Sequence, residues 1–114
     1  MTAIYDPIKE ATTRVVADQT IAVDAEGFMV DPQAWNDDVA VALAAEIGIE
    51  LTPQHWQVIR FTRQEFTANG DVPTLRRITT AGGVTTKELY ELFPKKPAKK
   101  VAYIAGLHKP SGCI

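Results

Sequence analysis

The chain has 114 residues, of which 46% are hydrophobic and 23% are charged, and its net charge is −2. This composition predicts one soluble globular domain and excludes fibrous, disordered and membrane-spanning classes, since no run of 18 apolar residues occurs. The absence of a signal-peptide pattern and the presence of a single cysteine, Cys113, favour a reducing, cytoplasmic compartment.

Charge is distributed unevenly along the chain. Residues 1–91 hold all 14 acidic residues and 7 of the 12 lysines and arginines, which gives this part a net charge of −7. Residues 92–114 carry five lysines and no acidic residue. We interpret this basic segment either as a solvated helix face or as a docking patch for an acidic partner or an RNA backbone.

The first part of the chain is predicted to be an extension followed by a β-hairpin. Residues 1–19 lack a strong period, so we expect a loosely ordered extension. From residue 20 to Val30, apolar residues alternate with smaller ones on both sides of the turn pattern Asp24-Ala25-Glu26-Gly27. This pattern is typical of a hairpin over residues 20–30.

Five helices are expected after the hairpin, over about residues 37–47, 53–69, 73–81, 86–93 and 97–106. Thr52 can cap the second of these and Pro53 suits its first position, while the third and fourth are separated by Gly82-Gly83. The fold class is therefore mainly α. We expect a helical domain over residues 20–106, with Trp56, Ile59 and Phe66 on its buried side, and a flexible C-terminal arm over residues 107–114.

The arm carries the candidate catalytic residue. Cys113 lies on a segment with Gly106, Pro110 and Gly112, which can form neither a helix nor a central strand. A lone cysteine is often a small buried residue, but chain ends are usually exposed. A fully extended segment from Ala105 to Cys113 would span roughly 25 Å, enough to enter the active site of another protein.

Other kinds of site are disfavoured. No cysteine or histidine pair has ligand spacing, so we expect neither a metal site nor a cofactor, and His55 is interpreted as a helix-start residue. Residues 52–93 could form a helix-turn-helix with Arg76 and Arg77 near its reading surface. The net charge of −7 over residues 1–91 makes DNA binding the weaker alternative.

Several segments together resemble the DsrC/TusE family of sulfur-relay proteins and sulfite reductase gamma subunits. The resemblance covers about residues 20–114 and includes Asp24-Ala25-Glu26-Gly27-Phe28 and Leu51-Thr52-Pro53-Gln54-His55-Trp56. Its most specific part is the tail, where Ala105-Gly106-Leu107 is followed by Lys109-Pro110 and by Gly112-Cys113-Ile114.

The resemblance implies that Cys113 accepts sulfur as a persulfide and hands it on. The implied partners are a sulfurtransferase donor of the TusBCD/DsrEFH type and a downstream acceptor protein, with a tRNA-modifying complex as one candidate. Arg76 matches a family arginine that can lie near the arm, where it and Lys109 would favour the thiolate. Gly106 and Gly112 would act as hinges, and Pro110 would restrict the tip of the arm.

Two departures from the family pattern bear on function. Members that work with dissimilatory sulfite reductase have a second arm cysteine at the position of Ala102, so this chain resembles the single-cysteine, TusE-like branch that serves tRNA 2-thiouridine synthesis. The segment after Ala81 is also shorter than in many bacterial members. The leading hypothesis is a covalent sulfur carrier with sulfurtransferase half-reactions. The alternatives are a docking subunit or regulator of a sulfite or disulfide reductase, and a helix-turn-helix module.

Overall fold

The computed structural model describes residues 12–110. Residues 1–11 of the predicted extension and residues 111–114, which include Gly112 and Cys113, lie outside the described residues. The elements in chain order are the strands β1 (Thr12–Val16) and β2 (Gln19–Val23), a short 3-10 helix η1 (Pro32–Ala34), and the helices α2 (Asp37–Glu46), α3 (Pro53–Asn69), α4 (Leu75–Ala81), α5 (Thr86–Leu92) and α6 (Pro97–Ile104). The mainly α fold with an N-terminal hairpin is confirmed.

The hairpin begins earlier than the sequence predicts. Strands β1 and β2 pair antiparallel around a two-residue turn in which Ala17 and Asp18 have φ values of 52° and 62°. Residues 12–19 thus belong to the hairpin and not to the predicted extension. The predicted turn at Asp24 exists, since the Gly27 N–H donates to the Asp24 carbonyl over 3.0 Å, but the expected second strand is reduced to a bridge between Val23 and Met29.

The helix ends follow the predicted capping signals. The Thr52 hydroxyl accepts from the His55 N–H at the start of α3, and α3 ends at Gly70, whose φ of 77° is left-handed. A capping box between Thr85 and Glu88 starts α5. Helix α4 begins two residues later than predicted because Thr74 caps it.

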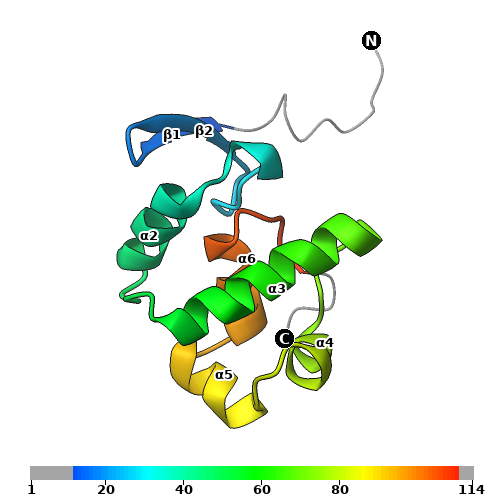
Figure 1. Cartoon of the computed structure of the whole chain (residues 1–114). Coiled ribbons are helices and arrows are strands. Elements are labelled where there is room, and N and C mark those ends of the chain that lie inside the picture. Colours follow the sequence, from blue (N-terminus) through cyan, green and yellow to red (C-terminus); the bar gives the residue numbers. More distant parts are fainter. Residues whose placement is uncertain (1–11, 111–114) are drawn as a thin grey trace.

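The central element of the fold is α6 (Figure 1). It contacts α2, α3 and α5, with α2 and the hairpin toward one end of the molecule and α4 and α5 toward the other. Its inward residues Val101, Ala102 and Ile104 are fully buried in the main core, as are Val58 and Ile59 of α3. The end of α6 therefore emerges from the middle of the core.

A second cluster of buried residues connects the hairpin to α2; it consists of Val16, Ile21, Val23, Met29, Val39 and Leu43. The side chains of Trp35 and Tyr103 pack against both clusters and join them. No helix within residues 12–110 combines the length and the apolar character that crossing a membrane requires.

Candidate functional site at the root of the cysteine arm

The segment that leads to Cys113 starts at the capped C-terminal end of α6. The Leu107 N–H donates to the Ala102 carbonyl over 3.0 Å, and Gly106 has a φ of 73°, which together form the left-handed turn that commonly ends a helix. We call residues 104–110 the arm root. Its geometry decides where the chain leaves the domain toward Cys113.

Two side chains from distant elements hold the arm root. The indole Nε1 of Trp35 donates to the Ile104 carbonyl over 2.8 Å. Arg63 of α3 donates through Nη1 to the Ala105 carbonyl over 2.6 Å and through Nη2 to the Pro32 carbonyl over 3.0 Å. The carbonyls of Ile104 and Ala105 lie at the C-terminal end of α6, where the helix offers them no further N–H. Side chains therefore satisfy them and fix the root.

Arg63 and Trp35 also contact each other. The guanidinium carbon of Arg63 lies 4.1 Å from the centroid of the Trp35 ring, which is within the range of a cation–π interaction. Burial lowers the pKa of Arg63, yet an arginine keeps its charge at neutral pH because its ordinary pKa lies far above neutrality. A permanent positive charge is thus stacked on the ring that covers the arm root.

Gly106, the predicted hinge, is itself part of this packing. A Cβ built on Gly106 would lie 2.4 Å from Cδ1 of Trp35, and Gly106 is buried. Any rotation about its backbone would have to move the indole. The glycine is required because only a residue without a side chain fits under Trp35 with a positive φ.

The arm root continues along the domain surface after Gly106. Leu107 is fully buried in the main core and Pro110 is also buried, so the predicted arm boundary at residue 107 is too early. Between them, His108 packs its ring edge-on against Phe66 with 5.7 Å between centroids. Its Nε2 lies 3.8 Å from the Asp71 carboxylate. Hydrophobic burial thus holds residues 107–110 on the domain.

The two predicted cationic residues differ in their surroundings. The Lys109 ammonium lies 3.2 Å from Glu26, which partly offsets its charge. Arg76 is exposed on α4, and within the described residues its guanidinium makes no hydrogen bond and no ion pair. Among the arginines of residues 12–110, Arg76 is therefore the one whose guanidinium is available to bind an anion.

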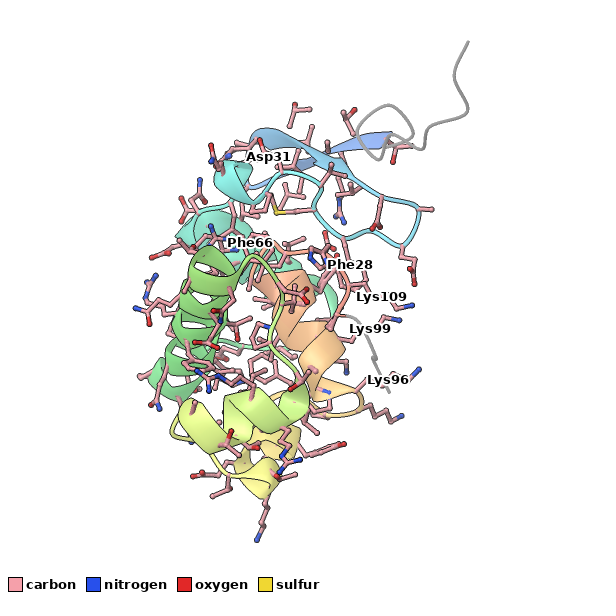
Figure 2. All side chains as sticks on the ribbon, turned by 90° about the vertical axis from the view of Figure 1, so that its right-hand side faces the viewer. Phe28, Asp31, Phe66, Lys96, Lys99 and Lys109 are labelled. Atoms are coloured by element: carbon pink, nitrogen blue, oxygen red, sulfur yellow. The ribbon has the colours of Figure 1, made fainter. Side chains whose placement is uncertain are left out.

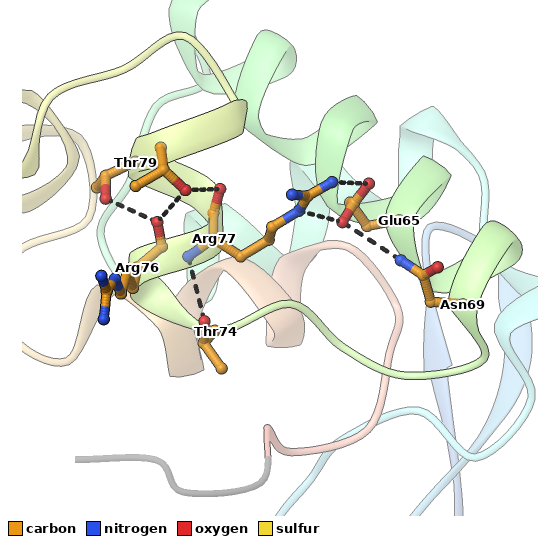
Figure 3. Close-up of polar contacts among 7 residues, drawn as sticks. Glu65, Asn69, Thr74, Arg76, Arg77 and Thr79 are labelled. Atoms are coloured by element: carbon orange, nitrogen blue, oxygen red, sulfur yellow. Dashed lines mark hydrogen bonds and ion pairs between the residues drawn. The ribbon is translucent and has the colours of Figure 1, made fainter.

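Its neighbour Arg77 has a structural role. Arg77 bridges α4 to α3 through Glu65, with Nε and Nη2 at 2.7 and 3.3 Å from the two carboxylate oxygens. Figure 3 shows this pair, with the Arg76 side chain pointing away from it. The hydrogen bond from Arg77 lowers the pKa of Glu65. One of the two arginines of the helix-turn-helix alternative is thus engaged within the domain.

Sequence reasoning did not identify Arg63 as a site residue. A signal was present, because Arg63 follows the buried Ile59 by four residues and precedes Phe66 by three, which sets a charged residue on the apolar face of α3. The interpretation of His55 as a helix-start residue is confirmed. His55 lies in the first turn of α3, where its ring accepts from the Thr52 N–H, and Ala102 of α6 is fully buried. Within residues 12–110, no group of three His, Cys, Asp or Glu side chains could hold a metal ion.

Comparison with known proteins identifies the family. The model of the family described as DsrC like protein matches residues 15–114. The chain is 41% identical to the sulfurtransferase TusE of Pectobacterium atrosepticum over 84% of this chain and 94% of the relative. It is 38% identical to the sulfurtransferase TusE of Escherichia coli K12 over 82% and 93% of the two chains.

Solved structures agree. The NMR structure of DsrC from Allochromatium vinosum matches with a TM-score of 0.80 and 37% identity, over 91% of this chain and 99% of that one. The crystal structure of the oxidized gamma subunit of dissimilatory sulfite reductase from Archaeoglobus fulgidus matches with a TM-score of 0.74 and 34% identity, over 90% and 100%. The matched region includes the arm root and Cys113, and the chain belongs to the DsrC/TusE family.

Proposed function

We propose that this protein is a sulfur-relay carrier that holds sulfur as a persulfide on Cys113. The observation that carries the proposal is the family match, which extends through Cys113 and includes relatives named sulfurtransferase TusE. The anchored arm root supports it, because a carrier needs a cysteine at a defined place on its surface. The transfer is assigned to the cytoplasm, where a free thiol stays reduced.

The transfer consists of two thiol exchanges. The Cys113 thiolate attacks the outer sulfur of a persulfide on the donor, so that a bond forms between Sγ and that sulfur while the sulfur–sulfur bond of the donor breaks and the donor leaves as a thiolate. An acceptor then takes the outer sulfur from Cys113 in the same way. The donor is a TusBCD/DsrEFH-type sulfurtransferase, and the acceptor is a protein of tRNA thiolation.

Arg76 is proposed to raise the reactivity of Cys113. Only the thiolate is nucleophilic, and a cysteine with an ordinary pKa near ~8.5 is only a few per cent ionised at neutral pH. A free guanidinium within about 4 Å would favour the thiolate by roughly 1 kcal/mol in water, and by more where water is excluded. Lys109 contributes less because it is paired with Glu26.

Intact mass spectrometry tests the carrier proposal. After incubation with a low-molecular-weight persulfide, the wild-type mass should rise by one sulfur atom, and reduction with a thiol should reverse the change. Cys113→Ser should show no increase while keeping the far-ultraviolet circular dichroism and the melting temperature of the wild type. If the wild type gains no sulfur at Cys113 from this donor or from a sulfurtransferase, the carrier proposal fails. The protein is then better interpreted as a docking subunit of a reductase.

The role of Arg76 has its own test. The rate of Cys113 alkylation by iodoacetamide, measured from pH 6 to 10, reports the pKa of the thiol. Arg76→Ala should shift this profile to higher pH, Arg76→Lys should restore most of it, and Arg77→Ala is the matched control that should leave it unchanged. Equal profiles for wild type and Arg76→Ala would remove Arg76 from the proposal without affecting the role of Cys113.

A further inference from the structure

A basic groove lies beside the arm root. It has a volume of about 550 Å³ and is lined by Glu26, Phe28, Ile47, Lys95, Lys96, Lys99, Lys100 and Tyr103. We call it the lysine groove. Figure 2 shows Lys96 and Lys99 on the same side of the molecule as Lys109 and Phe28. Four positive charges thus surround a depression whose other walls are largely apolar.

These four lysines lack carboxylate partners in the part of the chain that the structure describes. The five ion pairs found within residues 12–110 involve other cations. Lys100 donates to a neutral group, the Pro94 carbonyl. Glu26 is the one carboxylate that lines the groove, and it faces Lys109 at 3.2 Å. The positive charge of the groove is therefore not neutralised by the described residues.

The walls of the groove are held in place. Lys95 and Lys96 have φ values of 61° and 50°, a left-handed conformation that residues with a side chain rarely adopt, and Pro97 follows them as the first residue of α6. Tyr103, which also lines the groove, donates its hydroxyl to Glu46 over 2.9 Å, and its ring meets Phe28 edge-on at 5.7 Å between centroids. The groove is thus built from a constrained loop and a fixed aromatic side chain.

We propose that the lysine groove binds an acidic and partly apolar segment of the sulfurtransferase that donates sulfur to Cys113. Charge complementarity selects an anionic occupant, and the apolar walls formed by Ile47 and Tyr103 favour a peptide that also carries aliphatic or aromatic side chains. The partner assignment rests on the proposed carrier function. Glu26 lies both in the groove and against Lys109 of the arm root, so a segment bound in the groove brings its protein next to the arm.

A peptide fits the charge distribution better than a nucleic acid does. The five lysines of residues 92–114 adjoin a body in which residues 1–91 carry a net charge of −7. A polyanion longer than the groove would extend over this negatively charged part of the domain. The two would repel each other, because charges at physiological ionic strength interact over about one Debye length, ~8 Å. A short acidic segment that ends within the groove avoids this repulsion.

Binding is tested on the full chain by NMR with three probes. These are an eight-residue peptide of alternating Glu and Leu, the same peptide with Gln in place of Glu, and an oligonucleotide of single-stranded RNA. The Glu peptide should shift the amide signals of Lys95, Lys96, Lys99, Lys100 and Tyr103, and its affinity should fall at least tenfold between 50 and 500 mM salt. The Gln peptide should bind at least tenfold more weakly.

Charge-reversal variants localise the interaction. Lys96→Glu combined with Lys99→Glu should weaken binding of the Glu peptide at least tenfold, and the milder Lys96→Gln with Lys99→Gln should weaken it in the same direction. Lys87→Glu, on the exposed side of α5, is the matched control and should bind as the wild type does. Absence of shifts in the groove, equal binding of the Glu and Gln peptides, or tighter binding of RNA at the same residues would overturn the proposal.

The test of the lysine groove can fail independently of the test of the carrier proposal. Sulfur uptake from a low-molecular-weight persulfide needs no docking, so the groove variants should gain sulfur on Cys113 as the wild type does. Their rate of uptake from a sulfurtransferase donor should fall at least tenfold. A wild type that gains no sulfur from any donor would refute the carrier function, whereas normal uptake from the protein donor by the charge-reversed variant would refute the role of the groove alone.

Discussion

Arg63 donates a 2.6 Å hydrogen bond to the carbonyl of Ala105, a residue 42 positions away in the chain. The same guanidinium lies over Trp35, which binds the preceding carbonyl, that of Ile104. The exit of the chain from α6 toward Cys113 is thus held by side chains from α3 and from the segment before α2. Contacts of this kind link the stability of the domain to the position of its reactive end.

Arg63→Ala should destabilise the domain by about 2–4 kcal/mol, since it removes two charge-assisted hydrogen bonds and leaves the buried Ala105 carbonyl without its donor. Arg60→Ala is the matched control. Arg60 lies on the same helix with its guanidinium 5.0 Å from the Trp56 ring, but its side chain is 55% exposed and pairs with Asp37 at the surface. Its loss should cost less than about 1 kcal/mol. Urea denaturation measures both, and equal values would show that Arg63 does not hold the arm root.

Gly106→Ala should be among the most damaging glycine substitutions. The new Cβ would need a left-handed backbone, which costs roughly 1–2 kcal/mol, and would also overlap the Trp35 ring, for which a further ~1–3 kcal/mol is typical. Gly70→Ala isolates the first contribution, because Gly70 has a φ of 77° with no atom within 4 Å of the added Cβ. Thermal unfolding should rank wild type, Gly70→Ala and Gly106→Ala in that order. The reverse order would mean that Trp35 moves aside easily.

His55→Ala should lower the free energy of unfolding by about 2–4 kcal/mol, because the buried His55 ring links α3 to the end of α5 through hydrogen bonds. Its Nδ1 accepts from the Thr52 N–H over 3.1 Å, so the proton lies on Nε2, which donates to the Leu92 carbonyl over 2.8 Å. Gln54→Ala removes the neighbouring surface bond to Glu88 and should cost less than about 1 kcal/mol. Comparable losses for the two variants would refute the role given to His55.

Acid should destabilise the domain through its hydrogen-bonded carboxylates. The Thr85 N–H donates to Glu88 over 2.9 Å and lowers the pKa of Glu88 below its ordinary value of 4.5, with help from the Thr85 hydroxyl and Gln54. A lowered pKa contributes stability that is fully present above about pH 4.5 and is lost as the pH falls through the folded-state value.

Glu88→Gln keeps an oxygen that can accept from Thr85 but has no charge to lose. Its melting temperature should therefore fall less than that of the wild type between pH 5 and pH 3. Calorimetry at several pH values provides the measurement. Parallel curves for the two proteins would show that other groups account for the acid sensitivity.

The sequence predicted the local features of the fold well, because they depend on residues close together in the chain. The cap at Thr52 and the end of α3 at Asn69 are examples. The hairpin was displaced because its actual turn, Ala17-Asp18, lacks the Asn-Gly or Asp-Gly signature that usually marks a two-residue turn. The family itself was identified from the tail motif and is confirmed.

The candidate site was predicted only in part, for a physical reason. Cys113 and its neighbours form a sequence motif, whereas the contact of Arg63 with Ala105 joins residues far apart and leaves no local pattern. Gly106 was expected to be a hinge because glycine is permissive, but glycine is equally the residue that allows close approach of an aromatic ring. Which of these applies depends on Trp35, whose position follows from the tertiary structure.

The burial of Pro110 limits how donor and acceptor can share the carrier. Consecutive Cα atoms are about 3.8 Å apart, so the three residues from Pro110 to Cys113 span at most about 11 Å. As long as Pro110 stays packed, the Cα atom of Cys113 stays within that radius of one spot on the surface, and the thiol extends beyond it only by the length of the cysteine side chain. Two proteins large enough to enclose a persulfide cannot both occupy this volume. Donor and acceptor must therefore compete, and an excess of sulfur-free donor should inhibit the second transfer.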